Sequence, residues 1–103
     1  MIQMKTNIER LDGKIVATLI GELDTMAANE VENALKPLME SKGEEIIIEC
    51  KGLEYIASSG LRILLGILKN VMATGGSITL RNVNDDIKNV FILTGFVKLF
   101  KFE

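Results

Sequence analysis

Residues 44–50 read Glu-Glu-Ile-Ile-Ile-Glu-Cys, and the fold can be worked out from this stretch. Its uninterrupted apolar centre predicts a buried strand. Residues 14–20, Lys-Ile-Val-Ala-Thr-Leu-Ile, form an earlier run that is nearly continuous in apolar residues and rich in branched ones. We expect both runs to be central strands of one sheet, and the earlier strand to be buried on both faces.

The segment between these two strands has a helical pattern. Its apolar residues recur at helical spacing and are separated by mostly polar ones: Ala27, Val31, Leu35 and Leu38. A strand, a crossover helix and a second strand form a parallel pair. We expect Asp24 or Thr25 to cap this helix, Pro37 to kink or tighten its last turn, and residues 41–43 to end it.

The flanking segments complete the sheet. Asp12-Gly13 predicts a hairpin turn with positive φ at both positions, which makes residues 2–11 an antiparallel first strand. Residues 51–56 predict a connector anchored by Leu53 and Ile56. The elements expected after it are a helix at 59–73, a strand at 77–82, a helix capped by Asn84-Asp85-Asp86 and ended by Gly95, and a short strand at 97–102.

These elements predict one α/β domain over residues 1–103. Its central sheet is mixed, mostly parallel and of about five strands, with helices packed against it. The chain has 103 residues, of which 48% are hydrophobic, so there is enough apolar material for one core.

The composition excludes several classes of function. The net charge is −2 and the basic residues are scattered, whereas a nucleic-acid-binding surface needs clustered cations. No apolar run approaches the roughly 20 residues that span a bilayer, so we expect a cytoplasmic protein. The chain has no histidine, and its single cysteine, Cys50, is expected to be a buried apolar residue. We therefore expect no metal, no cofactor and no enzyme activity.

Two segments that follow predicted strands are candidates for a binding surface. Gly21-Glu22-Leu23-Asp24 follows the first buried strand, and Ala57-Ser58-Ser59-Gly60 precedes the next helix. The carboxyl ends of parallel strands lie at one edge of a sheet, so Asp24 and Ser58 are expected to be near neighbours. Two roles are open for Ser58: an N-cap, which composition alone favours, or an acceptor for a phosphate at the helix N-terminus.

The helix after Ser58 is apolar on more than one side. Leu61, Leu64, Leu65, Leu68, Val71 and Met72 are predicted to face inward. Ile63, Gly66 and Ile67 lie off that stripe, and either a neighbouring element covers them or they form an exposed patch for a partner helix. We expect Met26, Met39, Met72 and the two N-terminal methionines to fill the core.

Three motifs together resemble the STAS domain family, and specifically the bacterial anti-sigma factor antagonists. They are GELD at 21–24, SSGL at 58–61, and the segment at 74–102, and the resemblance covers essentially the whole chain in matching order. The resemblance implies the STAS fold. It also implies a partner that is both an anti-sigma factor and a serine kinase, which phosphorylates the antagonist and thereby switches it off, and a phosphatase that reverses the modification.

The resemblance assigns the phosphoacceptor to Ser58 and the acidic position of GELD to Asp24. Ser59 is an alternative acceptor. Regulated members of the family usually carry aspartate before the acceptor serine, where this sequence has Ala57. The surface expected to bind the partner consists of Glu22, Asp24, Thr25, Ala57, Ser58, Ser59, Gly60, Leu61, Arg62 and Ile63.

Because Ala57 replaces the usual aspartate, a second function without a phosphate switch is also considered. STAS domains that need no phosphate switch are subunits of larger assemblies, such as a lipid-transport ATPase complex or a signalling scaffold. Nucleotide binding, a third possibility from the resemblance, is not favoured because the chain lacks a glycine-rich phosphate loop with a lysine. The oligomeric state is left open.

Overall fold

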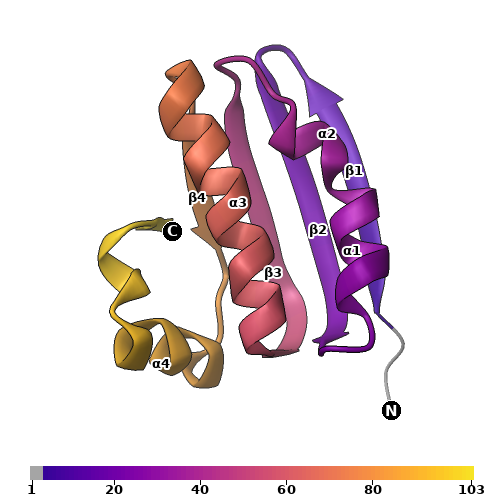
Figure 1. The fold of residues 1–103 in the computed structure, drawn as a ribbon, viewed down its shortest axis with the longest axis vertical. Coiled ribbons are helices and arrows are strands. Elements are labelled where there is room, and N and C mark those ends of the chain that lie inside the picture. The colour runs from indigo at the N-terminus through magenta and orange to yellow at the C-terminus, as the bar shows by residue number, and fades with distance from the viewer. Residues whose placement is uncertain (1–3) are drawn as a thin grey trace.

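The computed structural model describes residues 4–103, in which five strands form one mixed sheet in the order β1-β2-β3-β4-β5 (Figure 1). Residues 1–3, which include the expected start of the first strand at Ile2 and the first methionine, lie outside the described residues. The strands are β1 (Lys5–Leu11), β2 (Lys14–Leu23), β3 (Glu45–Ile56), β4 (Ser77–Arg81) and β5 (Lys101–Phe102). The helices are α1 (Ala28–Ala34), α2 (Lys36–Met39), α3 (Ser58–Thr74), α4 (Asp85–Thr94) and the 3-10 turn η1 (Phe96–Lys98).

The predicted hairpin and the parallel pairs are confirmed. β1 pairs antiparallel with β2, and Leu11 lies opposite Lys14 across a two-residue turn. Only Gly13 of that turn has a positive φ, of 68°, so the expectation of positive φ at Asp12 is wrong. β2, β3, β4 and β5 run parallel to one another. The sheet is therefore mixed and mostly parallel.

Helices α1, α2 and α3 lie over one face of the sheet (Figure 1). Alternate residues of β2 point toward them, and Ile15, Ala17 and Leu19 are fully buried there. The residues between them, such as Val16, are only half-buried, and Ile20 is 42% exposed on the other face. The expectation that β2 is buried on both faces is wrong, because α1, α2 and α3 cover only one of its faces (Figure 1).

The third strand is longer than expected. Residues 51–56, predicted to be a connector, continue β3 and pair with the end of β2. Two register shifts accommodate the extra residues, between Thr18 and Ile20 and between Gly21 and Glu22 on the β2 side. Such irregularities let Leu53 and Ile56 both face the core although they are three positions apart, a spacing that a regular strand does not allow.

The first helical segment is divided in two. α1 ends at Ala34, and Pro37 lies within the short helix α2, near its start. Proline is accepted there because its missing N–H has no intrahelical partner in a first turn. Val31, Leu35 and Leu38 are buried as predicted.

α3 packs across the middle of the sheet and supplies much of the core. Ile63 and Ile67 are 5% and 0% exposed, so they are covered and do not form an open patch. Met26 and Met72, expected in the core, are 92% and 74% exposed. The inward stripe of α3 is therefore rotated from the predicted one, with Leu65 only partly buried at its margin.

The carboxyl-terminal segment closes the core beside β4. Asn84 caps α4 as predicted, since its Oδ1 accepts a hydrogen bond of 2.8 Å from the Ile87 amide, and Gly95 ends the helix with a φ of 80°. Phe91 of α4 makes edge-to-face contacts with Phe100 and Phe102, with ring centroids 5.6 Å apart in both pairs. The expected last strand is reduced to two residues, because η1 occupies residues 96–98.

Within residues 4–103, no helix combines the length and the apolar character needed to cross a membrane.

Candidate functional site

The carboxyl ends of β2 and β3 meet at one edge of the sheet, the lower edge in Figure 1. Leu23 pairs with Ile56, and the Ala57 amide donates a 2.9 Å hydrogen bond to the Leu23 carbonyl. Asp24 and Ser58 follow directly on these paired residues. The prediction that they share one edge of the sheet is therefore confirmed. We call this edge, with residues 22–26 and 57–62, the carboxyl rim.

Gly60 sets how closely α3 approaches the rim. A Cβ atom at this position would lie 2.7 Å from Leu23 Cγ and 2.8 Å from Ile56 Cγ1, closer than such atoms approach one another. Only glycine leaves room for both side chains against the first turn of the helix. The position of Ser58, two residues earlier, is therefore fixed by packing between the α3 backbone and the ends of β2 and β3.

Ser58 is an exposed residue in the first turn of α3. The N-cap is Ala57, in an extended conformation, and no side chain caps the helix. The interpretation of Ser58 as the N-cap is therefore wrong. By helix geometry the amides of Ser58, Ser59 and Gly60 have no carbonyl partner four residues earlier within the helix. An open helix N-terminus of this kind favours negative charge.

The loop after β2 places a second group of residues on the rim. Asp24 Oδ1 accepts a 2.9 Å hydrogen bond from the Ala27 amide and closes the turn before α1. The N-cap of α1 is Ala27, with no side-chain cap, so the expectation that Asp24 or Thr25 caps this helix is wrong. Thr25 and Met26 are exposed at the tip of this turn. Met26 was missed as a surface residue, because its place in the sequence fits the apolar stripe of the following helix. Its 92% exposure is an unusual state for a large apolar side chain.

The other residues expected at the site divide by burial. Arg62 is exposed, and Glu22, Ala57 and Ser59 are half-buried. Gly60, Leu61 and Ile63 are buried, with Leu61 and Ile63 each 5% exposed. The expectation that these three contact a partner disagrees with their burial. They support the rim from the core.

Ser58 and Ser59 differ in accessibility although they are adjacent. The Ser59 hydroxyl oxygen is buried and has no hydrogen-bond partner within the described residues. Ser59 lines a hollow of about 240 Å³ between α1 and α3, together with Asn29, Glu32 and Arg62. An acceptor of a transferred group must be reached by the donor, which favours Ser58 over Ser59.

Cys50 takes no part in this surface. It is 2% exposed within β3, and burial, with a smaller effect of the neighbouring Glu49 carboxylate, raises the pKa of its thiol to about 12. The thiolate is therefore not populated at neutral pH, and the residue behaves as a small apolar side chain. Its expected role in the core is confirmed by its burial.

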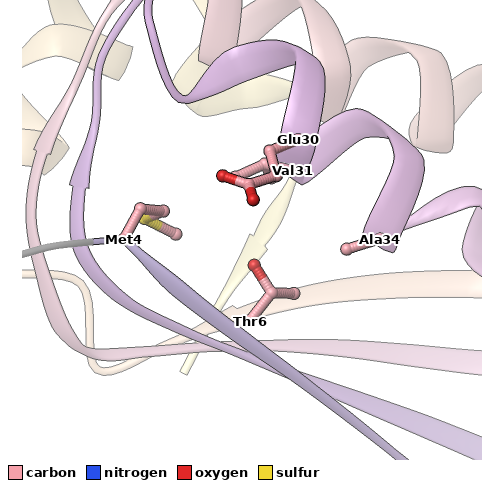
Figure 2. Close-up of a pocket in the computed structure, with 5 residues that line it drawn as sticks. All are labelled: Met4, Thr6, Glu30, Val31 and Ala34. Carbon is pink, nitrogen blue, oxygen red and sulfur yellow. The ribbon is translucent and has the colours of Figure 1, made fainter.

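A further hollow of about 200 Å³ lies between the start of β1 and α1 (Figure 2). In Figure 2 the carboxylate of Glu30, which lies beside Val31, and the hydroxyl of Thr6 point into it from opposite walls, with Met4 and Ala34 at its sides. Among residues 4–103, His, Cys, Asp and Glu side chains form no group of three or more that could bind a metal ion.

The comparisons with known proteins agree with this geometry. The sequence model of the STAS domain family matches residues 5–103, and the chain belongs to this family. The anti-sigma-B factor antagonist of Bacillus subtilis (strain 168) is 29% identical over 94 residues, which cover 91% of this chain and 85% of that protein.

Solved structures share the fold at lower identity. An anti-sigma factor antagonist from Mycobacterium paratuberculosis has a TM-score of 0.85 at 24% identity, covering 97% of this chain and 85% of that one. The Bacillus cell fate determinant SpoIIAA in its phosphorylated form has a TM-score of 0.73 at 23% identity, covering 96% and 91%.

Proposed function

We propose that this protein is an anti-sigma factor antagonist, which binds an anti-sigma factor through the carboxyl rim and is released when Ser58 is phosphorylated. The observation that carries the proposal is the exposed Ser58 side chain in the first turn of α3, beside the loop of Asp24. The family membership and the names of the relatives support the same function. We also propose that it acts in the cytoplasm as a non-enzymatic regulator.

The rim has the features of a docking surface. Met26 offers a large exposed apolar side chain, and Thr25, Ser58 and Arg62 surround the rim with exposed polar groups. Protein interfaces commonly combine an apolar centre with a polar border. Within residues 4–103, neither Asp24 nor Arg62 forms an ion pair, so both charges are free to meet charges of a partner.

The switch follows from charge. Transfer of the γ-phosphoryl group of ATP to Ser58 Oγ, with ADP as the other product, adds about −1.5 to −2 charges at the rim. The open amides of the first turn of α3 tolerate that charge in the free protein. In the complex the phosphate would have to be desolvated close to Asp24, which weakens binding. A phosphatase that removes the phosphate restores the antagonist.

Incubation with the cognate anti-sigma kinase and ATP, followed by mapping of the modified peptide, tests the acceptor. We expect one phosphate on Ser58, and none on a Ser58→Ala variant. The Ser59→Ala variant is the matched control and should be modified like the wild type, because the Ser59 hydroxyl is buried. Phosphate on Ser59 alone, or on neither serine, contradicts the switch.

Calorimetric titration with the unmodified anti-sigma factor tests the docking surface separately. We expect Ser58→Asp and Met26→Ala to weaken binding about tenfold or more, and Ser58→Ala to bind nearly as the wild type does. Leu93→Ala, which removes another highly exposed apolar side chain away from the rim, serves as the control. Equal affinity for all variants would place the interface elsewhere.

A further inference from the structure

A second surface lies on the outward side of α3, beyond the carboxyl rim. Leu65, Leu68 and Met72 of α3 and Leu99 beyond η1 line a groove with a volume of about 420 Å³. Met72 is 74% exposed and Leu99 is 51% exposed. Exposed apolar side chains gathered in one hollow are more informative than the same side chains scattered over a surface.

The charged side chains that line this groove are all positive. Arg62 and Lys69 are the charged residues among those that line it, and α3 as a whole carries these two cations and no acidic residue. Neither forms an ion pair within residues 4–103. The local positive charge contrasts with the net charge of −2 of the chain. An apolar groove flanked by unpaired cations complements an apolar ridge flanked by carboxylates.

We propose that this groove binds an amphipathic helix of a protein partner, in which acidic residues flank the apolar stripe. Leu65, Leu68 and Met72 repeat at the three- and four-residue spacing along which the ridges of a second helix pack. Arg62 and Lys69 are then placed to meet Asp or Glu side chains on the docked helix. Binding there removes Met72 and Leu99 from water.

Apart from Arg62, which also belongs to the rim, the residues that line this groove lie outside the rim of the proposed function. Met72 lies fourteen residues after Ser58 on the same helix, which is about 21 Å along its axis. Arg62 belongs to both surfaces, and it also lines the hollow on the α1 side of α3. A partner helix in the groove could therefore be held while the rim is free.

The structure favours a different protein over a second copy of this chain. Two copies joined groove to groove would bring four cations and no acidic residue of α3 into one contact, and like charges oppose such contact. A membrane surface is also a poorer match. The apolar groups line a hollow of about 420 Å³ rather than a protruding ridge that could enter the acyl region.

The test uses the full chain labelled with ¹⁵N and two synthetic helical peptides as probes. Both peptides carry leucine at helical spacing along one face. One has glutamate at the flanking positions and the other has lysine. We expect the acidic peptide to shift the amide signals of Arg62, Leu65, Lys69, Met72 and Leu99, and the basic peptide to bind at least tenfold more weakly.

The variants Met72→Glu and Lys69→Glu are each expected to lower the affinity for the acidic peptide at least tenfold. Both positions are exposed, so the fold should be retained, and thermal unfolding checks this. Leu93→Glu places the same charge on another exposed apolar residue, outside the groove, and should bind as the wild type does.

Three results would overturn the proposal. The first is equal binding of the two peptides, or no shift at the groove. The second is concentration-dependent self-association of the free protein that Met72→Glu abolishes, which would make a second copy the occupant. The third is Met72-dependent binding to phosphatidylglycerol vesicles with no response to the acidic peptide, which would make the groove a lipid contact. Failure of the Ser58 experiments leaves this proposal standing, because the variants Met72→Glu and Lys69→Glu and the signals of Lys69, Met72 and Leu99 lie outside the rim.

Discussion

The two ends of the parallel sheet differ in how their polar groups are satisfied. At the end where the parallel strands begin, Asn70 Nδ2 donates to the Ser41 carbonyl at 2.9 Å and lies 3.0 Å from Ser41 Oγ. Glu44 there pairs with Arg10 at 3.1 Å. At the carboxyl rim, Ser58 is exposed and its helix begins with no side-chain cap. At the first end, the closed end, side chains join separate elements by hydrogen bonds, whereas at the rim, the open end, the bond of Asp24 stays within its own turn and the start of α3 is open.

The difference shows which end can accept a partner without loss of stability. A buried polar group that loses its hydrogen-bond partner destabilises the fold, so the closed end cannot change its contacts freely. Groups at the open end already interact with solvent and can exchange water for another protein. The four predictions below test this comparison, from the largest expected effect to the smallest.

The largest effect concerns the packing beneath the open end. We expect Gly60→Ala to lower the free energy of unfolding by about 2–3 kcal/mol, because the new Cβ would overlap Leu23 and Ile56. Gly66→Ala is the matched control in the same helix, where the nearest atom is Met39 Cε at 3.8 Å. Denaturant unfolding should show Gly66→Ala to be stabilising by about 0.5–1 kcal/mol. Similar losses for both variants would contradict the close approach at Gly60.

The stability of the end where the parallel strands begin should depend on the hydrogen bonds of Asn70. Asn70→Ala removes the donors to Ser41, which is 4% exposed, and we expect a loss of about 2 kcal/mol in the free energy of unfolding. Asn89→Ala changes an exposed residue of α4 and should stay within about 0.5 kcal/mol of the wild type. Equal stability of the Asn70 variant, measured by urea unfolding, would mean that this end is not closed by these bonds.

Two helix starts at the carboxyl edge allow a sharper comparison. Asn84 caps α4 and also donates a 3.2 Å hydrogen bond to the Leu53 carbonyl, so Asn84→Ala should cost about 1–2 kcal/mol. Ser58 caps nothing, so Ser58→Ala should change the free energy of unfolding by less than about 0.5 kcal/mol. If thermal unfolding shows that Ser58→Ala loses as much stability as Asn84→Ala, Ser58 has a structural role.

The smallest effect is a pH dependence at the closed end. A hydrogen bond from the Lys42 amide, and next the Arg10 guanidinium, hold the pKa of Glu44 below its usual value. A carboxyl group with a depressed pKa in the folded state stabilises the fold above its unfolded pKa, and this contribution is lost as the pH falls. The difference in stability between the wild type and Glu44→Gln should therefore shrink between about pH 6 and about pH 3. A difference that grows on acidification would reverse the assigned direction.

Periodicity was sufficient to predict the sheet and most of the core, and it failed where the backbone departs from a regular period. The apolar runs at 14–20 and 44–50 indicated parallel central strands, as found. Leu53 and Ile56 are three positions apart, which is not the period of a strand, so their membership of β3 could not be read from the pattern. The register shifts that make it possible depend on contacts with β2.

The candidate site was predicted in position but not in detail. Topology placed Asp24 and Ser58 at one edge of the sheet, and the paired ends of β2 and β3 agree. The exposure of Met26 and the burial of Ile63 depend on where α1 and α3 lie over the sheet, which a helical pattern alone does not specify. Single-sequence periodicity gives the apolar side of a helix only to within about one residue position.

The length of α3 has a mechanical consequence. The helix has 17 residues and runs from the open end of the sheet to Gly75, where the chain turns back into β4. A hydrogen-bonded rod of that length does not compress, so a tilt imposed at its first turn has to reappear some 24 Å away at its last turn. Asn70, about 18 Å along the axis from Ser58 and close to the last turn, contacts Ser41. If partner binding shifts the helix, we expect the hydrogen bonds between Asn70 and Ser41 to be strained first. Faster hydrogen exchange of the amide groups around them would detect this.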